Sequence, residues 1–110
     1  MSGVQTGIVS CGEGRYELTG ELSFATVPEL WRSGNDALAK DAAVRLDLGG
    51  ITRVDSAGIA LLIELTRSVR SHGGEIVLEH APPQLMAIAK VSGLGEVLPF
   101  AREGADLPGN

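Results

Sequence analysis

The chain has 110 residues, which is the usual size of one domain and too short for two hydrophobic cores. Hydrophobic residues make up 44% and charged residues 21%, a composition that is ordinary for a globular protein and excludes a fibrous or disordered chain. The net charge of −5 and the absence of any run of Lys or Arg argue against nucleic-acid and anionic-membrane partners, because both need a basic surface.

The single cysteine, Cys11, excludes an intrachain disulfide, so nothing indicates an oxidising compartment. The first seven residues lack the basic and apolar regions of a signal peptide. The longest strongly apolar stretch, 59–63, is too short to span a bilayer. We therefore expect a cytoplasmic protein without direct membrane insertion. Its core should span about residues 8–100, with flexible ends at 1–7 and 102–110.

The first part of the chain predicts two strands and a helix. Residues 15–19 alternate apolar and polar side chains, which indicates a half-buried strand, and 8–11 is its expected hairpin partner. Thr26 is placed to cap a following helix, with Glu29 completing a capping box. Gly34 costs this helix about 1 kcal/mol relative to alanine, which points to a close contact. The residues expected to be buried in it are Val27, Leu30, Trp31 and Leu38.

The rest of the chain continues the alternation of strands and helices. The predicted elements are a strand over 44–48, a helix over 58–72 with a glycine C-cap at 73–74, a strand over 75–79, a helix opened by 82–83 and stopped by Gly93, and a short strand at 97–98. Such alternation indicates an α/β fold. Because the strands are half polar, we expect a single domain with a mixed β-sheet, helices packed mainly on one face, and the other face open to solvent.

The helix predicted over 58–72 has two different sides when its residues are projected at 100° each. The expected core stripe consists of Ile59, Leu62, Ile63, Leu65 and Val69. The opposite side carries small residues and little charge, and consists of Ala57, Ala60, Leu61 and Glu64. This side is either a solvated face with chance alanines or a flat patch that a partner protein approaches closely.

Catalytic groups are sparse in the sequence. His72 falls in the last turn of a predicted helix, where a cation suits the helix dipole, and His80 ends a predicted strand. Neither has the neighbouring ligands that a metal site needs. Ser56 stands outside any G-x-S-x-G motif, and Cys11 is expected to be a small core residue rather than a nucleophile. We therefore predict a protein that is not an enzyme and has no cofactor.

Ser56 stands where the predicted helix begins. Its hydroxyl suits an N-cap, a role that Asp55 is able to share. A hydroxyl at a helix N-terminus is also exposed, and the helix dipole tolerates a phosphate there, which would bring up to two negative charges to a docking surface. These considerations alone favour the cap.

Two segments carry a family resemblance, Leu46-Asp47-Leu48-Gly49-Gly50-Ile51 and Val54-Asp55-Ser56-Ala57-Gly58-Ile59-Ala60-Leu61-Leu62. They resemble the signature of STAS domains, and the likeness extends from Tyr16 to Leu98. In one branch, the anti-sigma factor antagonists, the motif serine is phosphorylated by a partner kinase, and Ser56 matches it. In another branch the domain is an accessory subunit of a phospholipid ABC transporter and docks on the cytosolic ATPase.

The resemblance implies a non-enzymatic interaction domain, and Ser56 fits either branch. The segment Phe24-Ala25-Thr26-Val27-Pro28 favours the transporter branch, because antagonists commonly carry a polar or acidic segment there. The implied partner is then the ATPase subunit of an ABC transporter, and the alternative partner is an anti-sigma factor or serine kinase. The implied partner-binding residues are Asp55, Ser56, Ala57, Gly58, Ala60, Leu61 and Glu64, with Ser56 also a possible phosphoacceptor.

Overall fold

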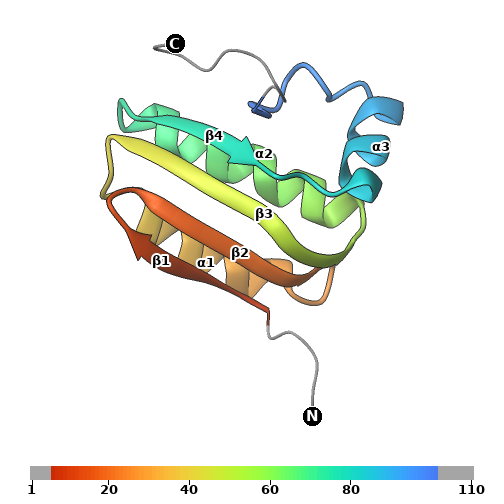
Figure 1. The fold of residues 1–110 in the computed structure, drawn as a ribbon, viewed down its shortest axis with the longest axis horizontal. Helices are drawn as coiled ribbons and strands as arrows, with labels where there is room; N and C mark the ends of the chain where they lie inside the picture. Colours follow the sequence, from red (N-terminus) through yellow and green to blue (C-terminus); the bar gives the residue numbers. More distant parts are fainter. Residues whose placement is uncertain (1–5, 102–110) are drawn as a thin grey trace.

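The computed structural model describes residues 6–101, which form one layer of helices against one β-sheet (Figure 1). The elements in chain order are β1 (Gly7–Gly12), β2 (Arg15–Leu22), α1 (Val27–Leu38), β3 (Ala43–Val54), α2 (Ser56–Ser71), β4 (Glu75–Glu79) and α3 (Pro83–Val91). The strands lie in the order β1-β2-β3-β4. The β1–β2 pair is antiparallel, whereas β2–β3 and β3–β4 are parallel, so the predicted mixed sheet is confirmed.

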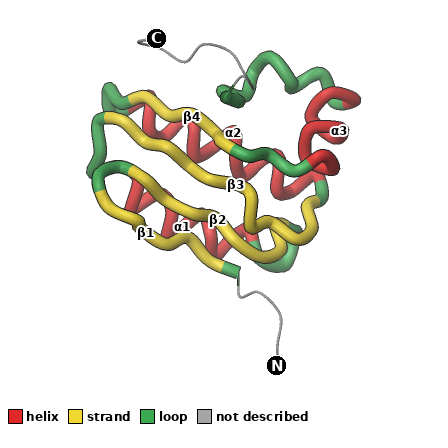
Figure 2. Tube along the Cα trace, in the orientation of Figure 1, coloured by secondary structure: helices red, strands yellow, loops and turns green. Residues whose placement is uncertain are grey.

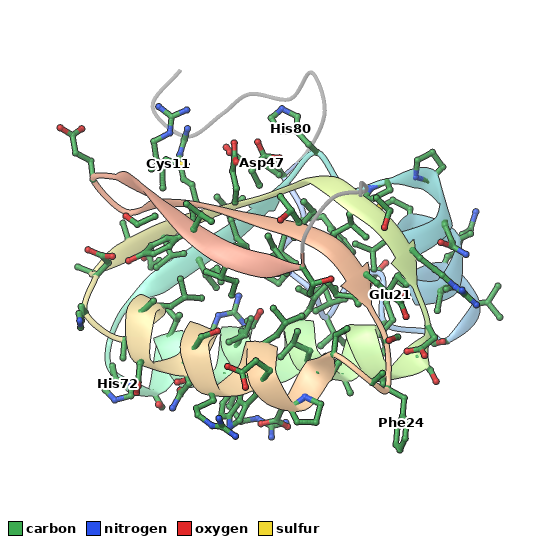
Figure 3. The ribbon with its side chains drawn as sticks, turned by 90° about the horizontal axis from the view of Figure 1, so that it is seen from below. Cys11, Glu21, Phe24, Asp47, His72 and His80 are labelled. Carbon is green, nitrogen blue, oxygen red and sulfur yellow. The ribbon has the colours of Figure 1, made fainter. Side chains whose placement is uncertain are left out.

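The two faces of the sheet differ as the half-polar strands predict. The inward residues of β2, β3 and β4 pack against α1 and α2 and build a core rich in leucine: Leu18, Leu22, Leu46, Leu48 and Leu78. The outward residues are charged, and Arg45 pairs with Glu79 at 3.4 Å. Figure 3 places Asp47, His80 and Cys11 on this open side, away from the helices. The prediction that Cys11 belongs to the core is wrong, because β1 is an edge strand and this side chain is exposed.

Helix α1 begins where predicted, but the expected capping box does not form. The Thr26 hydroxyl donates to the carbonyl oxygen of Glu21 at 2.6 Å and accepts from the Ser23 N–H at 3.0 Å, so it closes the turn instead. Leu30 and Leu38 are buried as predicted, while Val27 and Trp31 are half-buried against the core. The Thr26 hydroxyl, which the sequence pattern assigns to the cap of α1, thus bonds within the turn before the helix.

The close contact predicted at Gly34 is confirmed. A Cβ atom at this position would lie 2.7 Å from Cδ1 of Ile8 and 3.1 Å from Cδ2 of Leu65. Gly34 is therefore the point where α1 approaches both the edge strand β1 and the neighbouring helix α2. The absence of a side chain allows the two helices to share one layer over the sheet.

The chain after α2 differs from the prediction at its end. The expected C-cap is confirmed, since the Gly74 N–H donates to the carbonyl of Val69 at 3.0 Å. Residues 97–98 form no strand, and the edge of β4 is covered instead by an isolated bridge between Leu78 and Phe100. The backbone of Leu78 makes two hydrogen bonds there, at 2.9 and 2.8 Å, to 99 and 101. The predicted flexible ends fall largely outside the described residues, although Gly7 already belongs to β1.

Tyr16 joins the sheet to the end of α1 and gives a pH-dependent prediction. Its hydroxyl donates to the Asp41 carboxylate and lies 3.0 Å from the carbonyl oxygen of Ala37. Burial, together with the hydrogen bond to Asp41, raises the pKa of Tyr16 to about 12. Because the folded-state pKa lies above the ordinary value of 10, the stabilisation is fully present below pH 10 and is lost as pH rises towards about 12.

We expect Tyr16→Phe to lower the free energy of unfolding at pH 7 by about 1–3 kcal/mol, since a buried hydrogen bond to a charged group is lost. The same variant should lose less stability than the parent between pH 10 and about 12. Urea unfolding of both proteins across this range measures the difference. Identical pH profiles for the two proteins would show that folding does not raise the pKa of Tyr16.

Candidate functional site

The junction between β3 and α2 is built around the Asp55 carboxylate. The Asp55 N–H donates to the carbonyl of Leu22 at 3.0 Å, which fixes the junction to the end of β2. One carboxylate oxygen accepts from the N–H groups of Ala57 at 2.8 Å and Gly58 at 3.2 Å. Asp55 is therefore the N-cap of α2, and the predicted N-cap role of Ser56 is wrong. The extended backbone of Asp55 places it just before the helix, so Ser56 is already the first helical residue.

The other oxygen of Asp55 reaches a second loop, where it accepts from the Phe24 N–H at 3.2 Å. Figure 2 shows the β2–α1 and β3–α2 connections at the same end of the sheet. The Phe24 hydrogen bond is the largest cause lowering the pKa of Asp55, and the Gly58 and Ala57 N–H groups and the Arg53 charge add to it against desolvation. The carboxylate is consequently charged at neutral pH.

Ser56 is exposed, and among residues 6–101 its hydroxyl has no hydrogen-bond partner. The preceding residue, Asp55, caps the helix, so no hydrogen bond among the described residues depends on the Ser56 hydroxyl. A polar group at the start of a helix that has no structural task is available for a contact from outside. Ser56 is also the residue that the sequence motif indicates as a partner contact or phosphoacceptor.

The structure separates the other predicted site residues into two groups. Ala60 and Glu64 are exposed and Ala57 is half-buried, so these three are accessible. Leu61 exposes only 2% of its surface, so the prediction that it lies on the outer face of the helix is wrong, and Gly58 is buried as well. The cause is α1, which packs against one side of α2. Helix α2 therefore buries residues that face α1 in addition to those that face the sheet. Ile63, predicted to be buried, is only half-buried and lies on the side of α2 that faces Val97 and Leu98.

A groove runs between α1 and α2 beside these accessible residues. It has a volume of about 350 Å³ and is lined by Val27, Trp31, Ala60, Leu61 and Glu64. Phe24, in the turn that leads into α1, is 83% exposed and projects away from the body of the domain (Figure 3). We call the following residues the α1–α2 surface: Phe24, Val27, Trp31, Ser56, Ala57, Ala60 and Glu64.

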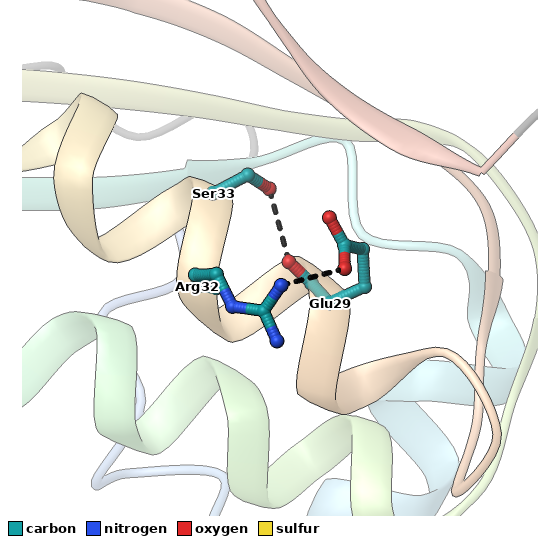
Figure 4. A network of polar contacts seen from close by, with 3 residues as sticks. All are labelled: Glu29, Arg32 and Ser33. Atoms are coloured by element: carbon teal, nitrogen blue, oxygen red, sulfur yellow. Dashed lines mark hydrogen bonds and ion pairs between the residues drawn. The ribbon is translucent and has the colours of Figure 1, made fainter.

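Two ion pairs on the exposed sides of α1 and α2 each lie within a single helix. On α1, Arg32 pairs with Glu29 at 3.2 Å, and the Ser33 hydroxyl donates to the backbone of Glu29 (Figure 4). On α2, Arg67 pairs with Glu64 at 3.0 Å. Such exposed pairs add little stability. The groove itself is lined mainly by apolar side chains, and its one charged residue among those described, Glu64, is paired, which suits an apolar partner surface better than an ion.

Sequence reasoning missed Phe24 and Trp31 as surface residues. Trp31 was assigned to the core because it has helical spacing with Leu30 and Val27, yet it is only half-buried. Phe24 stands alone between Ser23 and Ala25, and such isolation in a turn is the one local sign that it is not a core residue. Neither His72 nor His80 lies on the α1–α2 surface. Nδ1 of His80 lies 3.2 Å from Oδ1 of Asp47 on the open face of the sheet. Nδ1 of His72 lies 2.8 Å from the carbonyl oxygen of Ser68.

Two structural findings bear on other classes of function. Across residues 6–101, no three His, Cys, Asp or Glu side chains lie together in a way that would hold a metal ion. None of the helices in the described part of the chain is long and apolar enough to cross a membrane.

Comparison with known proteins places the sequence signature in context. The family model described as "Mlab, STAS domain" matches residues 12–99. The intermembrane phospholipid transport system binding protein MlaB of Escherichia coli is 30% identical over 83 residues, which are 74% of this chain and 84% of the relative. The anti-sigma-B factor antagonist of Listeria monocytogenes is 23% identical over 94 residues, covering 84% of this chain and 82% of the relative.

Solved structures support the fold. The anti-sigma factor antagonist SpoIIAA in its unphosphorylated form gives a TM-score of 0.66 at 20% identity, with 87% of each chain covered. A putative anti-sigma factor antagonist from Thermotoga maritima gives a TM-score of 0.71 at 16% identity, covering 86% of this chain and 85% of the other. These likenesses establish the arrangement of strands and helices and leave the partner to the surface chemistry.

Proposed function

This chain belongs to the STAS family, and we propose that it is a non-enzymatic subunit that binds the cytosolic ATPase of an ABC transporter for intermembrane phospholipid transport. STAS domains are binding and regulatory proteins. In this proposal the chain is MlaB-like, its partner is an MlaF-like ATPase, and it stays in the cytoplasm at the inner face of the membrane through that partner. The likeness to MlaB of Escherichia coli and the match to the MlaB-type family model support this branch.

The observation that carries the proposal is the exposed Phe24, which is tied to the start of α2 in a domain whose α1 and α2 enclose an apolar groove. An exposed aromatic residue next to a groove lined by a half-buried tryptophan is the composition found at the centre of protein interfaces. The small side chains of Ala57 and Ala60 allow a partner backbone or helix to approach α2 closely.

A second function has one specific observation in its favour, the exposure of Ser56. An exposed serine hydroxyl is accessible to a kinase, and an anti-sigma factor antagonist is among the relatives of this chain. A phosphate there would lie next to the Asp55 carboxylate, which already accepts from the first N–H groups of α2. The Asp55 carboxylate would repel the phosphate, and the added negative charge would weaken an apolar contact with a partner protein. Incubation with an anti-sigma kinase and labelled ATP separates the two functions, since stable label on Ser56 supports the switch.

Titration of the purified chain with the MlaF-like ATPase of the same organism tests the proposed function. Saturable binding by calorimetry, and ATP hydrolysis that depends on the chain, are the expected results. The matched control is the same titration with the anti-sigma factor kinase. Absence of binding to the ATPase together with binding to the kinase would replace the proposed function by the alternative.

Substitutions at Ser56 distinguish a contact from a cap. Because Asp55 caps α2, we expect Ser56→Ala to change the free energy of unfolding by less than about 0.5 kcal/mol and to weaken ATPase binding. Ser56→Thr keeps a hydroxyl and should retain most of the affinity. Ser56→Asp should be folded and at least as stable as Ser56→Ala, but defective in binding because it adds charge to the surface. Thermal unfolding and partner titration measure both quantities, and parental affinity of Ser56→Asp would exclude Ser56 from the contact.

A further inference from the structure

The Asp55 carboxylate accepts hydrogen bonds from the start of its own helix and from Phe24, which lies 31 residues earlier in the chain. One oxygen accepts from the start of α2, and the other accepts from the Phe24 N–H in the turn between β2 and α1. A helix cap requires only the first of these tasks. The second oxygen therefore does something that capping does not explain.

The direction of the Phe24 side chain depends on its backbone. The side chain is 83% exposed, so few contacts fix it. Its turn is closed at other points, where the Thr26 N–H donates to the Ser23 carbonyl at 2.9 Å and the Ala25 N–H donates to the Ser23 hydroxyl at 3.3 Å. These bonds hold the turn to itself. Among the described residues, the hydrogen bond from the Phe24 N–H to Asp55 is the one that ties this amide to the start of α2.

We propose that Asp55 is a positioning residue, whose second carboxylate oxygen holds the Phe24 turn against the start of α2 so that Phe24 and Ser56 form one preorganised partner-binding surface. Fixing a contact residue before binding lowers the conformational entropy that association must overcome. The identity of the partner used to measure the effect rests on the proposed function. The coupling between the two loops rests on the fold alone.

Asp55→Asn separates positioning from capping. Asparagine is as good an N-cap as aspartate, and its amide oxygen is able to accept from the N–H groups of Ala57 and Gly58. Its amide nitrogen would then take the place of the second oxygen and face the Phe24 N–H, so that two donors meet. The variant should keep the cap and lose the tie to the turn.

Hydrogen exchange on the isolated domain tests the coupling without any partner. In Asp55→Asn we expect the Phe24 amide to exchange about tenfold faster than in the parent. The Ala57 and Gly58 amides should stay within about threefold of the parent, because the cap remains. Unchanged exchange at Phe24, or equal acceleration at all three amides, would overturn the proposal.

A double-mutant cycle tests the consequence for binding, with the MlaF-like ATPase as the probe. Asp55→Asn should weaken affinity about tenfold in the parent but less than about twofold in a Phe24→Ala background, since its effect acts through the aromatic ring. Equal losses in both backgrounds, or no effect of Phe24→Ala alone, would overturn it. If the parent chain does not bind the ATPase at all, the proposed function fails, and the exchange experiment still decides whether Asp55 positions the turn.

Discussion

Leu61→Asp is expected to leave the domain largely unfolded at room temperature. The Leu61 side chain exposes 2% of its surface and belongs to the core between α1 and α2. Removing a buried leucine alone costs about 2–5 kcal/mol, and an unpaired carboxylate in the same space costs several more or takes up a proton. A domain of this size has a total stability of about 5–15 kcal/mol, so the two losses together consume most or all of it.

Ala60→Asp is the matched control, because it introduces the same side chain one residue earlier on the exposed face of α2. Its cost to the fold should be limited to the lower helix propensity of aspartate, about 0.7 kcal/mol. Its effect should appear in binding instead, since a charge at the rim of the groove is desolvated without a pair. We expect ATPase affinity to fall by about tenfold to a hundredfold.

Circular dichroism, thermal unfolding and titration of the two variants measure these outcomes together. A cooperative transition for Leu61→Asp within a few degrees of the parent would show that this side chain is not part of the core. Unchanged ATPase affinity of Ala60→Asp would remove the middle of α2 from the α1–α2 surface. The pair of variants therefore separates the fold of α2 from its use.

The sequence predicted the α/β class, the mixed sheet and most helix positions, because alternation and helical spacing are local signals. It also predicted the burial of Ile59, Leu62, Leu65 and Val69, which is confirmed. It placed Leu61 outside because a single core stripe was assumed. The projection of one helix contains no information about α1, and it is α1 that encloses Leu61. Pairwise packing of this kind depends on residues distant in the chain.

The site itself shows the same limit. Asp55 and Ser56 are both good N-cap residues, and their order in the sequence does not decide which one caps. The decision is tertiary: the Asp55 N–H bonds to the Leu22 carbonyl, which holds Asp55 in an extended conformation beside the end of β2, and its carboxylate then caps a helix that begins at the next residue, Ser56. The turn that carries Phe24 is joined to this junction by a hydrogen bond across 31 residues. Motif spacing found the junction, and only the fold brought Phe24 to it.

Gly58→Ala is expected to destabilise the domain by about 2–3 kcal/mol, although alanine in an exposed helix would be worth about 1 kcal/mol more than glycine. A Cβ atom at Gly58 would lie 2.7 Å from the carbonyl oxygen of Leu22, 2.7 Å from its Cβ and 2.8 Å from Cγ2 of Val54. Two of these three atoms are rigidly placed by the end of β2. The same carbonyl accepts the Asp55 N–H, so moving it would disturb the junction as well as the packing.

The resulting fall in the unfolding midpoint should be on the order of 10 °C, and Gly7→Ala provides the matched control. Among residues 6–101, no atom outside its two chain neighbours lies within 4 Å of a Cβ built at Gly7, so that change should leave the midpoint almost unaltered. If Gly58→Ala were as stable as the parent, the first turn of α2 would be able to move away from β2. If it is destabilised as expected, the glycine of the signature serves the close approach of α2 to the sheet.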